Sequence, residues 1–241
     1  AICALANSYK DLRDRISDIV VGWKKDGATP VTAREIKGIG SIMALLRDAI
    51  KPNLAQTAEG QPTIVHMGPF GNIAHGCSSI IADKLAVNCG EYVITEAGFG
   101  ADLGFEKFMD IKVRQGGPKP SAAVVVATIR GLKWPGGVAI KDMSLANPEA
   151  VRRGGENLKN ALRIVGLYGL PAVVAINRFP TDFHEEIAVV KEVAMASGAI
   201  RVEEAKGFAE GGDGMVDLAN AVVEAANQPS DVKLLYEDDD D

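Results

Sequence analysis

The sequence is poor in aromatic side chains, in cysteine and in long apolar runs. Aromatic residues make up only 5% of the chain, so any aromatic side chain outside the core merits inspection as a ligand contact. The three cysteines, Cys3, Cys77 and Cys89, form no CxxC pair, so we expect reduced thiols, no disulfide framework and no metal site. No apolar run approaches the roughly 20 residues that cross a bilayer, and no secretory signal is recognisable. A cytoplasmic protein without a membrane partner is the simplest expectation.

Positive charge is not in excess either. The formal net charge is -6, whereas a protein that neutralises nucleic-acid phosphates needs a concentrated basic surface. Nucleic acid is therefore excluded as the main partner. Hydrophobic residues at 47% and charged residues at 24% are close to the averages for globular proteins, so this length of chain predicts a folded domain rather than disorder.

The pattern of apolar residues changes near residue 61. Residues 1–60 are predicted to be mainly helical, because Leu12, Ile16 and Ile19 recur at helical spacing. Residues 61–241 alternate short apolar runs with longer amphipathic stretches, which is typical of βα units. The expected fold class is α/β: a mostly parallel sheet flanked by helices, preceded by a helical subdomain. The predicted strands are 63–66, 92–95, 122–128, 172–177 and 199–202, and the predicted helices are 72–87, 148–165, 183–196 and 215–226.

Ligands of such sheets bind beyond the carboxyl ends of the strands, so the segments that follow the strands carry most weight. Residues 66–76 are a glycine-rich turn into a helix that either holds an anion on free backbone N-H groups or is a structural turn with His75 packed. Residues 95–104 surround Phe99 with glycines. Either its ring face is open to a planar ligand, or Phe99 plugs the core while Glu96 and Asp102 cap helices.

Three later segments leave similar alternatives. Residues 128–137, with Lys133 among them, form either a basic mobile loop over an acidic substrate or a solvated loop. Asn177 and Asp182 follow an apolar strand. Either the Asn177 amide and the Asp182 carboxylate form hydrogen bonds with a purine base, or Asp182 is the N-cap of the next helix. Residues 208–214 again pair one aromatic, Phe208, with a glycine turn.

These segments, taken in order, closely resemble the formyltetrahydrofolate synthetase (formate-tetrahydrofolate ligase) family. The matching runs are GPFGNIAHG from Gly68, TEAGFGADLG from Thr95 and AINRFPTD from Ala175. The resemblance implies a P-loop NTPase-like α/β fold in which ATP phosphorylates formate to formyl phosphate, and N10 of tetrahydrofolate then takes the formyl group. It also implies Mg2+ with ATP, a monovalent cation (K+ or NH4+) as activator, and an oligomer of like or unlike chains.

The same resemblance assigns binding roles to individual residues. It places Phe99 and Phe179 beside the pterin ring, and Phe208 where the family usually has Trp followed by Ala-Lys-Gly-Gly; this chain has Ala-Glu-Gly-Gly after Phe208. Asn177 and Asp182 are then the expected nucleotide-binding residues. The chain is thus expected to supply the pterin side and the adenine side of the ligase.

One family feature is absent from the 241 residues. The sequence contains no GxGKTT-like phosphate loop and no following Arg that would grip formyl phosphate. Phosphoryl transfer would lose its main electrostatic stabilisation without them, so the catalytic residues are not in this chain and the chain alone is predicted to be inactive. We expect an internal fragment or one subunit of a split enzyme, with the family's N-terminal phosphate-loop and C-terminal regions elsewhere. The alternative is a non-catalytic binding or assembly module that retains the pocket shape.

Overall fold

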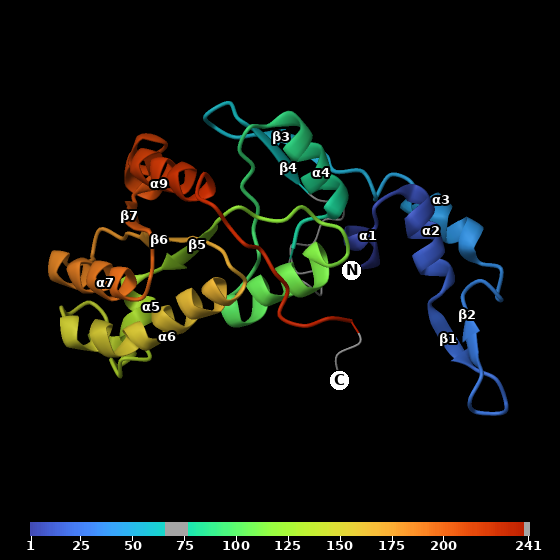
Figure 1. Ribbon diagram of the computed structural model, residues 1–241, viewed down its shortest axis with the longest axis horizontal. Helices are drawn as coiled ribbons and strands as arrows, with labels where there is room; N and C mark the ends of the chain where they lie inside the picture. Colours follow the sequence, from blue (N-terminus) through green and yellow to red (C-terminus); the bar gives the residue numbers. More distant parts are fainter. Residues whose placement is uncertain (66–76, 239–241) are drawn as a thin grey trace. The chain divides into compact units, whose positions relative to one another are not determined.

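The computed structural model describes residues 1–65 and 77–238 (Figure 1). Its contacts divide the chain into two compact units. The first unit comprises Ala1–Phe99 and Leu103–Pro118, and the second comprises Gly100–Asp102 and Lys119–Asp241. No helix within the described residues is both long enough and apolar enough to span a bilayer.

The first unit combines short helices with two antiparallel hairpins. Its core is formed by Leu12 and Ile16 of α2 packed with Ile39 and Met43 of α3. Ile19 follows α2 and is exposed, and strands also occupy 20–23, 30–32 and 53–56, so a mainly helical segment at 1–60 is not confirmed. Ser8 caps α2 by accepting a hydrogen bond from the Asp11 amide. The elements are α1 (Ile2–Leu5), α2 (Tyr9–Ser17), β1 (Val20–Trp23), β2 (Pro30–Thr32), α3 (Ile39–Leu46), β3 (Asn53–Gln56), β4 (Pro62–Val65), α4 (Ile80–Cys89), and the π-helical segments η1 (Ala101–Phe105) and η2 (Phe108–Val113).

Several predictions for this part of the chain were wrong. Strand β4 is the predicted strand at 63–66, but it pairs antiparallel with β3 in a hairpin and belongs to no parallel sheet. Residues 92–95 form no strand and are exposed. An apolar β-branched run becomes a strand only where another strand supplies its hydrogen-bond partners, and the sequence of one segment does not contain that information.

The second unit contains a parallel three-stranded sheet in the order β5-β6-β7. Strand β6 (Ala172–Asn177) is the central strand, with β5 (Ala123–Ala127) and β7 (Arg201–Ala205) parallel to it on either side. Because the central strand of a parallel sheet is covered on both faces, its side chains from Ala172 to Ile176 are all buried. This confirms the expected α/β fold with a parallel sheet.

Helices cover both faces of this sheet. Helix α9 (Val216–Ala226) packs Leu218, Ala221 and Ala225 against Val173 and Ala175 of β6. Figure 1 shows α9 on one side of the sheet, and α6 (Pro148–Leu167) and α7 (His184–Ala196) on the other. These three helices start and end within two residues of the predicted bounds. The remaining elements of this unit are α5 (Ile129–Lys133), η3 (Ile140–Asp142), α8 (Gly207–Glu210) and η4 (Asp213–Met215).

Candidate functional site

The loops that follow β5, β6 and β7 lie at one edge of the sheet, because the three strands are parallel. The ends of β6 and β7 are in register, with Asn177 opposite Ala205. The next residue, Arg178, donates its backbone N-H to the Ala205 carbonyl at 3.1 Å, so the pairing extends one residue past the strand. This carboxyl edge is where a parallel α/β sheet binds its ligands.

Asn177 and Asp182 are both at this edge. Asn177 is the last residue of β6 and is exposed. Asp182 accepts a hydrogen bond from the Phe179 amide at 2.8 Å, while its own amide donates to the Phe179 carbonyl at 3.0 Å. Helix α7 has Phe183 as its N-cap, without a side-chain cap. The interpretation of Asp182 as the helix N-cap is therefore wrong, and its carboxylate instead fixes the turn that carries Phe179.

Two of the three predicted pterin aromatics belong to the same edge. Phe179 follows β6 and is 41% exposed. Phe208 lies in α8, directly after β7, and is 88% exposed. The turn after α8 uses Gly211 at φ 61°, a conformation that favours glycine. Neither ring is a core residue, so both are free to contact a ligand.

Phe99 belongs to the first unit, and its local backbone explains its exposure. Gly98 and Phe99 both have positive φ, 65° and 53°. Gly104 approaches so closely that a Cβ on it would stand 1.2 Å from the Gly98 carbonyl oxygen. This tight turn holds Phe99 outward with 81% of its surface exposed, so the interpretation of Phe99 as a core plug is wrong. Convergence of Phe99 with Phe179 and Phe208 on one cleft stays a prediction.

A cluster of charges that the sequence analysis did not identify joins the ends of β6 and β7. The Glu204 carboxylate accepts from Arg178 at 2.5 Å and from Lys191 of α7 at 2.9 Å. Burial raises the pKa of Glu204, but the hydrogen bonds from Lys191 and Arg178, with their positive charges, outweigh that effect and lower it below its usual value. Glu204 therefore stays ionised and holds Arg178 beside the predicted purine residues.

The segment after β5 is partly packed: residues 130, 131, 134, 135 and 137 are exposed, and the other five are buried or half-buried. Thr128 caps α5, with its hydroxyl accepting from the Gly131 amide at 2.9 Å. Gly136 lies against the backbone of α6, where a Cβ would come within 2.0 Å of the Ala150 carbonyl oxygen. The Arg153 guanidinium binds the Gly136 carbonyl at 2.8 Å. The segment is thus a short helix and a packed turn with exposed residues between them, and its role as a mobile loop over a substrate stays a prediction.

Lys133 of this segment is buried in an ion pair. Its Nζ lies 2.6 Å from Oε1 of Glu186, and both side chains are almost completely buried. The sequence contains a signal that identifies Glu186. It lies in the stripe of α7 that also contains Val190 and Val193, both buried, and a carboxylate in an apolar stripe needs a buried partner.

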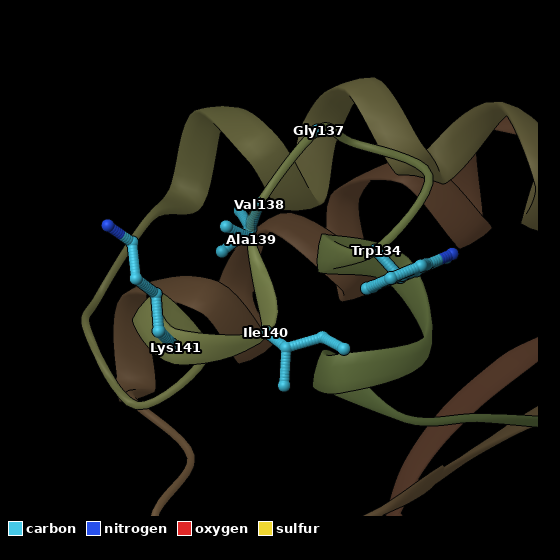
Figure 2. A pocket seen from close by; sticks show the side chains of 6 residues that line it. All are labelled: Trp134, Gly137, Val138, Ala139, Ile140 and Lys141. Atoms are coloured by element: carbon cyan, nitrogen blue, oxygen red, sulfur yellow. The ribbon is translucent and has the colours of Figure 1, made fainter.

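Beside this ion pair the surface forms a shallow depression with a volume of about 590 Å³. In Figure 2 the side chains of Trp134 and Ile140 face each other across it, while Lys141 points away. Trp134 is 59% exposed, so an apolar surface is open to solvent here. The depression is lined by Trp134, Gly137, Val138, Ala139, Ile140 and Lys141.

The predicted anion-binding turn at 66–76 lies outside the described residues, so its role stays a prediction. Cys77, immediately after it, is buried, and burial is the main cause that raises the pKa of its thiol to about 11. Among the described residues no disulfide joins Cys3, Cys77 or Cys89.

Comparisons with known proteins identify the family. A family model described as "Formate--tetrahydrofolate ligase" matches residues 1–241. The chain is 52% identical to a "Formate--tetrahydrofolate ligase" of Roseiflexus sp. (strain RS-1) over 98% of this chain and 43% of that protein. It is 50% identical to a protein of the same name from Symbiobacterium thermophilum, over 100% of this chain and 43% of that protein. The chain spans less than half the length of these relatives, and it belongs to the formate-tetrahydrofolate ligase family.

Proposed function

We propose that this chain is part of an ATP-dependent ligase that forms 10-formyltetrahydrofolate from formate and tetrahydrofolate through formyl phosphate. It supplies the pterin side and the adenine side of the active site. The observation that carries the proposal is the carboxyl edge of the second unit. There, exposed Phe179 and Phe208 follow two adjacent parallel strands, and Asn177 and Asp182 lie on the first of the two loops. We also propose that Phe99 contacts the pterin ring, and that these loops belong to an α/β domain that starts at residue 61.

Each of these side chains suits one part of the substrates. A pterin is flat, and stacking against an aromatic ring buries its faces. A purine presents donors and acceptors along its edge, which the amide of Asn177 and the carboxylate of Asp182 complement. Because Asp182 already holds the turn through one carboxylate oxygen, its other oxygen is the one that we assign to the base.

The phosphate chemistry is assigned to the remaining part of the enzyme. The 241 residues contain no Gly-Lys-Thr phosphate loop, so the groups that hold the ATP phosphates with Mg2+ and grip formyl phosphate come from a P-loop NTPase-like region outside this chain. A monovalent cation, K+ or NH4+, is proposed as activator. No residue of this chain is assigned a catalytic role.

Strand β5 supports the proposal that another part of the enzyme packs on the second unit. Val126 is 66% exposed and Val124, on the same face, is also exposed, although strands of a parallel sheet are normally covered on both faces. Among the described residues β5 pairs only with β6, which leaves its other edge without a strand. The remaining part of the ligase, in the same or a partner subunit, is the proposed occupant.

A second candidate function is a binding or assembly module that keeps the pocket but performs no chemistry. The missing phosphate loop favours it, because a module of that kind needs none. The two candidates differ in one observable: only the ligase segment restores turnover when the phosphate-loop region is supplied.

A chimeric enzyme tests the proposal. This chain would replace the matching segment of the Roseiflexus sp. relative, to which it is 52% identical, and formation of 10-formyltetrahydrofolate and ADP would be measured with formate, tetrahydrofolate and ATP. Turnover that requires all three substrates is the expected result. A folded chimera that binds tetrahydrofolate without turnover would establish the binding module instead, and one that binds neither tetrahydrofolate nor ATP would refute both.

A further inference from the structure

The buried pair of Lys133 and Glu186 holds together three separate segments of the second unit. Lys133 ends α5, and its Nζ donates to the carbonyls of Met143 at 3.2 Å and Leu145 at 2.9 Å. Oε1 of Glu186, in the first turn of α7, accepts from this Nζ at 2.6 Å and from the Asn147 amide at 2.7 Å. The pair thus connects the end of α5, the segment 143–147 and the start of α7.

Each connected segment borders the carboxyl edge of the sheet. Helix α5 follows β5 directly, and the Asn147 side chain caps α6 by accepting from the Ala150 amide at 3.0 Å. Helix α7 begins directly after the turn that carries Phe179 and Asp182, and the Glu186 amide donates to the Phe183 carbonyl at 3.1 Å. The Lys133 Nζ also lies 5.7 Å from the centre of the Phe183 ring. The pair therefore fixes the C-terminal base of the turn 179–182.

Stability is a weak reason for this arrangement. Removing two charges from water is unfavourable, and a buried pair often contributes no more stability than well-packed apolar side chains would. Within the described residues no hydrogen bond reaches the other carboxylate oxygen of Glu186, which adds to the cost. What apolar side chains cannot supply is the set of directed bonds to Met143, Leu145 and Asn147, and these bonds define one position for each segment.

We propose that Lys133 and Glu186 are positioning residues for the substrate-binding turn at 177–182. This inference rests on the proposed function, which assigns that turn to ATP and tetrahydrofolate. The pair holds the start of α7 at a fixed place relative to the sheet, so that Phe179 and Asp182 meet their substrates without reorganisation. Neither residue contacts substrate, and formate, which we assign to the part of the enzyme outside this chain, does not depend on the pair.

The test uses the chimeric full-length ligase with Glu186→Gln. Glutamine keeps the shape and one acceptor but removes the charge that pairs with Lys133. The matched control is Glu192→Gln on the same helix, which breaks an exposed pair whose carboxylate oxygens lie 2.9 and 2.7 Å from the Arg152 guanidinium. A double variant, Lys133→Met with Glu186→Leu, removes both charges and leaves no uncompensated charge if the single variant does not fold. Steady-state KM for each substrate, kcat and thermal midpoints would be measured for all variants.

For Glu186→Gln we expect the KM for ATP or tetrahydrofolate to rise about tenfold, since a small displacement of a binding turn is enough to weaken binding by that factor. The KM for formate should not change. The Glu192→Gln control should leave the KM values for ATP, tetrahydrofolate and formate unchanged. A purely structural role would lower the thermal midpoint and the amount of active enzyme while leaving every KM in place, and this would overturn the inference. An equal rise in all three KM values would overturn it as well.

If the unsubstituted chimera binds neither ATP nor tetrahydrofolate, the proposed function has failed, which is a different outcome from unchanged KM values in an active chimera.

Discussion

Phe208, in α8 shortly after β7, has 88% of its surface exposed, so its ring is not part of the core. Exposed apolar residues are common singly, but this one shares the carboxyl edge with Phe179 in a chain where aromatic residues are only 5% of the total. We propose that both rings contact the face of a flat ligand.

If these rings stack on the pterin, their substitution changes tetrahydrofolate affinity. Phe179→Ala in the chimeric ligase is expected to weaken binding by about 1 to 3 kcal/mol, because the aromatic contact area is lost. Phe208→Trp is expected to tighten binding, because it adds ring area where the family usually has Trp. Isothermal titration with tetrahydrofolate measures both changes.

The control is Leu167→Ala, which removes an exposed apolar side chain from the C-terminal end of α6. It should leave tetrahydrofolate affinity unchanged. Affinity that is equally insensitive to Phe179→Ala would remove Phe179 from the pterin site.

Cys77 and Cys89 provide a residue-scale test of the first unit. The rise of the Cys77 pKa from 9.0 to about 11, caused mainly by burial, lowers its thiolate fraction at pH 8 about a hundredfold. Cys89 is exposed. We expect a thiol reagent at pH 8 to label Cys89 within the time in which Cys77 stays unmodified, with Cys77 reacting after denaturation. Peptide mass spectrometry reads both sites, and equal labelling of the two in the folded chain would contradict the burial of Cys77.

At the residue scale the sequence predicted which residues follow the strands better than it predicted which charged side chains pair with each other. Asn177 and Asp182 were found because the end of their strand is visible in the apolar pattern, whereas Phe179 and Phe208 were singled out by the family resemblance. All four lie at the end of a strand of the parallel sheet or follow one. Glu186 and Lys133 were not paired in advance, because which charged residues meet in a core depends on how α5 and α7 pack. The same limit applies to Glu204, whose partners come from a strand end and from a different helix.

At the scale of elements, prediction succeeded where the pattern was long or continuous. Strand β6 has its predicted bounds, because its five consecutive buried side chains produce an uninterrupted apolar run. Helix α7 begins one residue later than predicted and ends where predicted. The strands β1, β2 and β3 were missed, because they are only three or four residues long and β1 and β3 are largely exposed, so they show no apolar alternation to detect. Strand β4 was predicted, but its antiparallel pairing with β3 was not.

The Glu204 cluster makes a prediction at the same scale, because it joins β6, β7 and α7. The folded state holds the pKa of Glu204 below its usual value, so as the pH falls the unfolded chain takes up the proton first and the folded state loses stability. Glu204→Gln is therefore expected to lower the free energy of unfolding by about 1 to 2 kcal/mol at pH 7. This difference should shrink as the pH falls through the usual carboxylate pKa, about 4.3.

Urea unfolding of the 241-residue chain at pH 7 and pH 4 measures the difference. Glu192→Gln, which breaks an exposed pair on α7, is the control and should cost less at pH 7. A Glu204→Gln penalty that is the same at both pH values would show that the charge of Glu204 does not hold the three elements together.

At the scale of the whole molecule, the exposed face of β5, which carries Val124 and Val126, is the surface that we expect another part of the enzyme to cover. Replacing exposed Val126 by Asp should leave the second unit folded, since this side chain is solvated there. In the chimeric ligase the same change is expected to prevent the remaining part from packing on the sheet, because a carboxylate would then be buried without a partner. Met195→Asp, also exposed, is the control on the same unit. Normal assembly and activity of the Val126→Asp chimera would exclude β5 as the contact.

The absence of a phosphate loop leads to the last prediction. Phosphoryl transfer depends on backbone amides, a Lys and a metal ion that hold the phosphates in line and neutralise the charge that develops on them. The carboxyl edge described for the second unit offers side chains for a base and a flat ring, but the chain contains no Gly-Lys-Thr loop to supply those groups. The 241-residue chain by itself is therefore expected to show no ATP hydrolysis that depends on both formate and tetrahydrofolate. The measurement is ADP release with each substrate omitted in turn, and the chimeric ligase is the positive control. Turnover by the pure chain that needs all three substrates would mean that this chain holds the phosphates in a way that no Gly-Lys-Thr loop provides, and the assignment of phosphate chemistry to another part of the enzyme would have to be abandoned.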